Sequence, residues 1–237
     1  MTIDDIPVIA PYFRFVTTNT CDFTVGGMFM WRDYFHMAWQ VKDGVLYSTL
    51  TGEDGNLYYN LPLGEDIPAG LRQCLARHPE RPVRFCTIPE ADLPLFQELP
   101  GRVEITEEEN FADYLYSAEE MIQLSGKKFS GQRNHISRFL RTCQSWSFEP
   151  LDSTDAAEVE AFFHTLNKKL NYAPGEAAEE NHKVQEVLEH LDQYGLVGGA
   201  LRADGAIVGF TLGEVLRDTL YIHIEKADRD YPGAYQM

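Results

Sequence analysis

The sequence predicts a mixed α+β fold built from two halves with the same order of elements. In each half, helical periodicity comes first, three short strand-like runs separated by turn residues follow, and a helix comes next. The chain has 237 residues, of which 44% are hydrophobic and 24% charged, which is typical of a soluble globular protein with room for two domains. The repeat is one of element order only, because the two halves share little sequence.

Residues 1–112 are expected to form the first domain around an antiparallel meander. An amphipathic helical stretch covers 3–16, and the strands are expected at 35–41, 45–50 and 57–61. Asp43-Gly44 and Asp54-Gly55 separate these runs, and Asp-Gly pairs favour the positive φ angles of tight hairpins. The rest of this half is predicted as a helix at 67–77, a strand at 83–87, a helix from Pro89 and a strand at 102–105.

Residues 113–237 are expected to form the second domain, after an acidic connection at 107–110. A short helix from Ser117, with Glu120 in the position of a capping box, leads to a longer helix at 127–143. The later elements are predicted as a strand at 146–151, helices at 154–170 and 178–194, strands at 197–202, 207–216 and 219–226, and a helix near Gly233. The second copy of the repeat therefore ends soon after its meander.

The net charge, the hydropathy and the cysteines of the chain limit the partners, the location and the thiol chemistry that we expect. The 37 acidic and 20 basic residues give a net charge of −17, so an anionic partner must contact a local basic patch. The sequence shows neither a secretory signal nor an apolar run of membrane-spanning length, which predicts a cytoplasmic protein without integral membrane association. The four cysteines are widely spaced and are expected to be reduced thiols rather than metal ligands.

A basic helix is the first candidate functional feature. Its cations, within a stretch that has no acidic residue, are Lys127, Lys128, Arg133, Arg138 and Arg141. Together with Asn134 and His135 on the same helix, and with free backbone N–H groups near Gly126 and Gly131, they would receive phosphate groups. The alternative is a solvated helix surface that balances the acidic residues before it.

The last predicted strand is the second candidate feature. Alternation places Leu220, Ile222 and Ile224 on one face and Tyr221, His223 and Glu225 on the other. His223 and Glu225 would then converge on a substrate as proton-transfer groups, and Glu214 of the preceding strand is expected within reach of them.

Alternatively, these groups pair with Lys226, Arg229 or Arg202 in a structural network. Arg229 is expected at the end of the strand, where open sheets commonly bind ligands, and is included among the donor-binding candidates. The acidic, Pro232-containing stretch after the strand argues against ordinary use of acetyl-coenzyme A.

Six separated segments resemble those of a known bacterial family. They are Cys21-Asp22-Phe23, Trp31-Arg32-Asp33-Tyr34, Asp113-Tyr114-Leu115-Tyr116, 126–135, 223–227 and 233–236. In this order they resemble the family that joins the C-terminal catalytic region of phosphatidylglycerol lysyltransferases with stand-alone proteins of unknown function. The resemblance implies two tandem GNAT-like (acyl-CoA N-acyltransferase-like) domains, and in the lysyltransferases this region transfers an aminoacyl group from charged tRNA to a lipid head group.

The sequence departs from the family pattern in two places. Gln132 stands where the family usually has a basic residue, and the chain stops before the Asn-Arg-Glu motif and the basic segment that follow in the family. We therefore expect the second GNAT-like domain to be incomplete and Met237 to be the end of a fragment.

Two functional hypotheses remain open. The first is an acyltransferase-like protein that uses aminoacyl-tRNA or acyl-CoA as donor, an amine, hydroxyl or lipid as acceptor, and no permanently bound cofactor. The second is a noncatalytic binding module that keeps the tandem fold without a donor cleft. A membrane-bound lysyltransferase is a third, weaker hypothesis, because the acidic chain would be repelled by anionic lipid.

Overall fold

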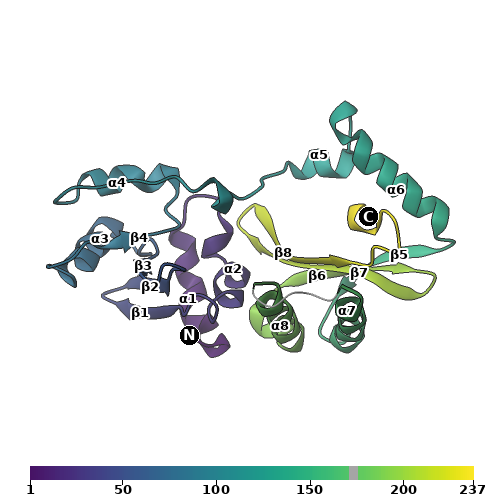
Figure 1. Ribbon diagram of the computed structural model, residues 1–237, viewed down its shortest axis with the longest axis horizontal. Coiled ribbons are helices and arrows are strands. Elements are labelled where there is room, and N and C mark those ends of the chain that lie inside the picture. Colours follow the sequence, from purple (N-terminus) through teal and green to yellow (C-terminus); the bar gives the residue numbers. More distant parts are fainter. Residues whose placement is uncertain (171–175) are drawn as a thin grey trace. The chain divides into compact units, whose positions relative to one another are not determined.

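The computed structural model describes residues 1–170 and 176–237, which form two compact units, Met1–Asp113 and Tyr114–Met237 (Figure 1). Each unit contains a four-stranded sheet together with helices, so the predicted mixed α+β class is confirmed. No helix in the described ranges combines the length and the apolar composition needed to cross a bilayer.

The first unit begins with a run of short helices that supplies much of its core. These are η1 (Ile3–Asp5), α1 (Ile6–Ile9), η2 (Ala10–Phe15), η3 (Cys21–Phe23) and α2 (Val25–Met30). Ile9, Phe13, Phe23 and Phe29 are almost completely buried, which explains the apolar periodicity of this stretch. The Thr24 hydroxyl accepts a hydrogen bond of 3.0 Å from the Gly27 N–H and so caps α2.

The sheet of the first unit combines a meander with one parallel pair. Its strands, in spatial order, are β1 (Ala38–Lys42), β2 (Val45–Thr51), β3 (Leu57–Tyr59) and β4 (Arg84–Phe85). The β1–β2 turn has positive φ at Asp43 (52°) and Gly44 (73°), as the Asp-Gly pair predicts. Because β4 pairs parallel with β3, the chain must cross over between them, and α3 (Ile67–Ala76) lies in this crossover.

The strand expected at 102–105 is absent, and this prediction is wrong. After η4 (Glu90–Asp92) and α4 (Leu93–Gln97), residues 102–108 have no regular structure. Val103 and Ile105 are exposed and no neighbouring strand pairs with them. A strand-like composition does not produce a strand when no neighbouring strand provides hydrogen-bond partners for the backbone N–H and C=O groups.

The second unit follows the predicted order of elements closely. Its helices are α5 (Ala118–Gln123), η6 (Lys127–Phe129), α6 (Ser130–Thr142), α7 (Ala156–Leu170), α8 (Glu176–Glu189), α9 (Leu191–Tyr194) and η7 (Ala234–Gln236). Its strands, each antiparallel to the next, are β5 (Trp146–Leu151), β6 (Val197–Ala203), β7 (Ala206–Leu216) and β8 (Thr219–Ala227). The Ser117 hydroxyl accepts from the Glu120 N–H and caps α5, while the Glu120 carboxylate pairs with Lys128, so only the Ser117 half of the predicted capping box forms.

Helices lie on both faces of this second sheet. Helices α7 and α8 lie on one face, while α6 and η7 lie on the other (Figure 1). On the first face, Phe162 and Phe163 of α7 make edge contacts with Phe210 of β7, with ring centroids 6.2 and 6.1 Å apart. On the second face, a cluster of buried residues joins α6 and η7 to the sheet, and it contains Phe139, Cys143, Leu201, Ala203, Val208, Ala227 and Ala234.

Arg202 links β6 to β5 and α7, and its replacement by glutamine tests this link. Its guanidinium donates to Glu149 at 3.0 Å and to both oxygens of Glu158 at 2.7 and 2.6 Å, which lowers the pKa of Glu158. A carboxylate whose pKa is lower in the folded than in the unfolded protein stabilises the fold at pH values above its unfolded pKa, which is near 4.5 for a glutamate. This stabilisation is lost as the pH falls through the folded-state pKa.

We expect Arg202→Gln to lower the free energy of unfolding by about 1 kcal/mol or less at neutral pH, because the pair is solvent-screened. The difference from the wild type should shrink between about pH 5 and pH 3. Urea titrations across this range measure it, with Arg72→Gln as a control because the exposed Arg72 forms no ion pair within the described part of the chain. A difference that does not depend on pH would contradict this account.

Candidate functional site

A buried carboxylate and a buried imidazole lie side by side on β7 and β8. Glu214 Oε2 is 3.5 Å from His223 Nε2, and their side chains are only 10% and 6% exposed. Glu214 pairs with Tyr221 across the ladder, and Tyr221 is also buried. Within residues 1–170 and 176–237, His223 Nε2 makes no hydrogen bond. A buried polar atom in this state is costly in a purely structural role, so the pair is the strongest candidate for proton transfer in the second unit.

A β-bulge creates this arrangement. Leu212 pairs with Ile224 and Gly213 pairs with Ile222, so that His223 is an extra residue in β8. A Cβ atom on Gly213 would lie 2.2 Å from the Tyr221 carbonyl oxygen, so only glycine allows the two strands to approach this closely.

The bulge also overturns the prediction that His223 and Glu225 share a face. Beyond the bulge, Glu225 pairs with Thr211, whose side chain alternates to the face opposite Glu214. Ile224 correspondingly moves to the Glu214 face and is buried. Partial burial raises the pKa of Glu225, yet this carboxylate cannot act together with His223. Of the two predicted carboxylates, the structure therefore brings only Glu214 next to His223.

Helix α8 contributes a second set of buried charges on the face of the sheet that carries Glu214. The Lys183 ammonium is almost completely buried and lies 3.2 Å from Glu186 Oε2, while the other oxygen of Glu186 accepts a hydrogen bond from the Tyr194 hydroxyl. Nearer to the start of the helix, Glu180 pairs with Lys226 of β8 at 2.7 Å. Each buried cation thus has a carboxylate partner, as burial requires.

These α8 residues were not among the functional residues predicted from the sequence. The available signal was Lys183 lying within an apolar helical pattern, since Val184, Val187, Leu188 and Leu191 are all buried. A lysine on such a buried face requires a carboxylate partner for its charge. The sequence alone does not show that its partner is Glu186, one turn further on.

The structure divides the predicted basic residues into two groups. Arg133 of α6 donates to the Leu124 and Gly126 carbonyls, and Lys128 of η6 pairs with Glu120 of α5 at 2.7 Å. Both side chains therefore connect the end of α5 to the segment that follows it. The other predicted residues are exposed and form no ion pair or side-chain hydrogen bond within the described part of the chain, and they are Lys127, Asn134, His135, Arg138 and Arg141. The exposed cations remain candidates for contacts with phosphate.

The end of β8 is held by a lysine from α7. Lys169 donates to Asp228 at 2.6 Å and to Asp230 at 3.0 Å. Burial alone would raise the pKa of Asp228, but the hydrogen bonds from Lys169 and from the Asp230 N–H, together with the charge of Lys169, outweigh it and lower this pKa. Arg229, between the two aspartates, is exposed. The alternative pairing of His223 or Glu225 with Lys226, Arg229 or Arg202 does not occur, because Lys226 and Arg202 pair with other carboxylates and Arg229 forms no ion pair among the residues that the structure describes.

Three of the four cysteines have environments that oppose nucleophilic chemistry. None of the four forms a disulfide, and burial raises the pKa of both Cys74 and Cys86 to about 12 and that of Cys21 still further. A thiol with so high a pKa stays protonated at neutral pH. In the described part of the chain, no group of three His, Cys, Asp or Glu side chains is placed to hold a metal ion.

Four of the six recognised segments meet in pairs. In the first unit, the Cys21 N–H donates to the Asp113 carboxylate at 2.8 Å. In the second unit, Gly233 lies so close to α6 that a Cβ atom would be 2.1 Å from the His135 carbonyl oxygen. The segments that carry the resemblance are therefore also packing positions.

These observations define a two-sheet α+β protein with a buried Glu–His pair on two adjacent strands. The comparisons with known proteins identify its family. The model of the phosphatidylglycerol lysyltransferase C-terminal family matches residues 13–237. The chain therefore belongs to this family, and the resemblance inferred from the sequence is confirmed.

Two solved structures are similar to the chain. A conserved protein of unknown function from Bacteroides thetaiotaomicron VPI-5482 has 30% identity and a TM-score of 0.82, with coverage of 100% of this chain and 81% of that chain. The C-terminal domain of a protein from Agrobacterium fabrum, assigned as a lysylphosphatidylglycerol synthetase, has 15% identity and a TM-score of 0.58, with coverage of 98% and 71%. The second similarity supports the fold alone. No curated protein matches the chain.

Proposed function

We propose that the protein is an acyltransferase that moves an aminoacyl or acyl group from an activated donor to an amine or hydroxyl acceptor. Membership of the lysyltransferase family supports the reaction class. The observation that carries the proposal is the buried Glu214–His223 pair, because acyl transfer to an amine or hydroxyl requires a base for the proton that the acceptor loses.

In the proposed reaction, the acceptor nitrogen or oxygen attacks the donor carbonyl carbon. The new bond to the acceptor forms, the bond between this carbonyl carbon and the donor's leaving oxygen or sulfur breaks, and the acceptor proton passes to the imidazole of His223. Glu214, whose carboxylate lies 3.5 Å from His223 Nε2, would stabilise the imidazolium that results. The leaving group then recovers the proton from His223.

We infer that each unit is a variant of one GNAT-like fold. In the first unit, the meander is followed by α3 and by β4, which pairs parallel with β3. In the second unit, β5 and helices α7 and α8 precede the antiparallel strands β6 to β8. Each unit would then contain a different but overlapping set of the helices and strands of the GNAT-like fold.

The exposed cations of η6 and α6 are proposed to contact the phosphates of the donor. Lys127, Arg138 and Arg141 project from a protein of net charge −17, so they provide a local positive region that the whole molecule lacks. Arg229, exposed at the end of β8, is a further candidate for this role.

One experiment distinguishes the donor classes. The protein is incubated separately with a mixture of aminoacyl-tRNAs and with acyl-CoA, at two salt concentrations, and consumption of the donor is measured. For a tRNA donor we expect Arg138→Gln/Arg141→Gln to weaken tRNA binding and to reduce the slope of log K against log[salt] by about 2. Arg72→Gln/Arg84→Gln, which removes the same charge from the first unit, should change neither quantity.

A noncatalytic binding module is the second candidate function. The low exposure of Glu214 and His223 favours it, because a buried polar pair also occurs in purely structural networks. Failure of the protein to consume either donor, at either salt concentration, would favour this candidate over the transferase.

A further inference from the structure

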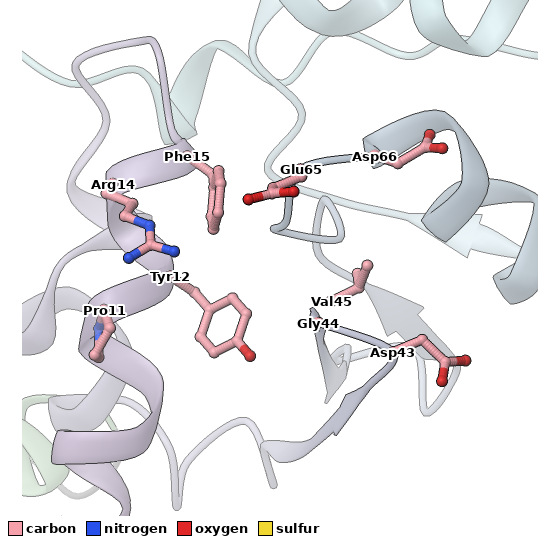
Figure 2. Close-up of a pocket in the computed structure, with 9 residues that line it drawn as sticks. All are labelled: Pro11, Tyr12, Arg14, Phe15, Asp43, Gly44, Val45, Glu65 and Asp66. Atoms are coloured by element: carbon pink, nitrogen blue, oxygen red, sulfur yellow. The ribbon is translucent and has the colours of Figure 1, made fainter.

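The first unit contains an open cavity of about 520 Å³ that the proposed transfer reaction does not use. One wall is η2, with Tyr12, Arg14 and Phe15, and the opposite wall is made by the β1–β2 turn and by the loop that leads into α3 (Figure 2). All the lining residues lie between Pro11 and Asp66, so the cavity belongs to the first unit alone.

The η2 wall is aromatic and already accommodates a cation. Tyr12 and Phe15 are one turn of the 3₁₀ helix apart, with ring centroids separated by 6.2 Å. The Arg14 guanidinium lies 4.7 Å from the centroid of the Phe15 ring. Aromatic rings attract cations and pack against alkyl chains, so this wall suits a ligand that has both.

The opposite wall supplies an unpaired carboxylate. In Figure 2 the Glu65 carboxylate extends from its loop toward the Phe15 ring, whereas the carboxylates of Asp43 and Asp66 turn away along the rim. Within the described residues, Glu65 and Asp43 form no ion pair, and Asp66 is engaged as the cap of α3 through the Ala69 N–H at 2.8 Å. The lining contains three carboxylates and one guanidinium, which gives it a net charge of −2.

The arrangement of these carboxylates favours an organic cation over a metal ion. Mg²⁺ and Ca²⁺ require several oxygens that converge on one point, and the three carboxylates here point in different directions (Figure 2). A ligand with two separated positive charges and an alkyl chain would neutralise the lining and cover the rings.

We propose that this cavity binds a linear aliphatic diamine. One ammonium group contacts Glu65 beside the aromatic wall, the alkyl chain lies over Tyr12 and Phe15, and the second ammonium group is attracted by the rim carboxylates. The guanidinium of Arg14 competes with the ammonium groups of the diamine for the carboxylates of the cavity. The proposal does not depend on acyl transfer, because no residue of the Glu214–His223 pair takes part.

Calorimetric titration of the whole chain with 1,4-diaminobutane at low salt tests the proposal. Glu65→Gln should weaken binding about tenfold, because it removes a charge-assisted contact. Arg14→Gln should tighten binding by about threefold, since it removes a repelling charge. The control Glu107→Gln removes an equal charge from an exposed acidic run outside the cavity and should leave the affinity within about twofold.

Each of three results would overturn the proposal. If Glu107→Gln weakens binding as much as Glu65→Gln, the diamine is bound only by the overall negative charge. If Arg14→Gln weakens binding, the site prefers a ligand with a carboxylate, such as a zwitterion. If Mg²⁺ binds as tightly as the diamine, the alkyl chain contributes nothing.

Discussion

Replacement of Glu214 by glutamine is expected to reduce the rate of acyl transfer by about 10²- to 10⁴-fold, the usual contribution of a positioned acid–base group. Glutamine keeps the size of the side chain but cannot stabilise an imidazolium on His223, 3.5 Å away. The loss should therefore appear in kcat rather than in KM. Single-turnover consumption of the donor, measured on protein with an unchanged circular dichroism spectrum, gives the result.

Glu225 provides the matched control for this experiment. It is a glutamate on the same pair of strands, but it lies on the opposite face of the sheet. Glu225→Gln should change the rate less than about threefold. The double variant Glu214→Gln/His223→Gln should be no slower than the slower of the two single variants, because the two groups act as one unit. Equal losses in Glu225→Gln and Glu214→Gln would show that the assigned pair is wrong.

Replacement of Gly233 by alanine is expected to destabilise the second unit by about 3 kcal/mol or more. A Cβ atom at this position would lie 2.1 Å from the His135 carbonyl oxygen and 3.2 Å from the Phe139 Cβ, and the residue has a φ of +97°. Both the contact and the backbone conformation therefore oppose any side chain. Urea unfolding of the full chain, followed by tryptophan fluorescence, measures the change.

Gly131 is a suitable control for Gly233, because a Cβ atom there meets nothing within 4 Å and its backbone is helical. Gly131→Ala should leave stability unchanged or raise it by up to about 1 kcal/mol. If Gly233→Ala is as stable as Gly131→Ala, then the close packing of η7 on α6 does not contribute to the fold.

The sequence predicted the elements whose formation depends on local signals. The strand at 146–151 was placed with its observed bounds, and the strands of the second sheet agree to within one residue. Asp43-Gly44 adopts the positive φ angles expected of a hairpin turn, whereas in Asp54-Gly55 only Gly55 has a positive φ. In these places a short segment contains the information that determines its own conformation.

Errors arose where the outcome depends on a distant partner. The segment 102–105 has the composition of a strand but lacks a sheet edge to pair with. The prediction that His223 and Glu225 share a face was wrong because of the β-bulge. The bulge depends on the close approach of Gly213 in β7 to Tyr221 in β8, which the alternation of residues along β8 does not reveal.

The candidate site was therefore only partly predictable. His223 and Glu214 were recognised as titratable residues on adjacent strands, and the structure places them in contact. Arg133 and Lys128 were expected to bind phosphate, but both are engaged between α5 and α6. Whether a basic side chain is exposed or bonded to a neighbouring helix depends on tertiary contacts, which the helical periodicity of the sequence does not show.

The bulge at His223 also has an evolutionary consequence. The strands pair regularly on both sides of this one residue, from Leu212 with Ile224 and from Gly213 with Ile222. Insertion or deletion of a single codon at this point would therefore add or remove the imidazole without shifting the alignment of the rest of the ladder. Descendants of such a gene could gain or lose the imidazole in one genetic step while inheriting the same scaffold.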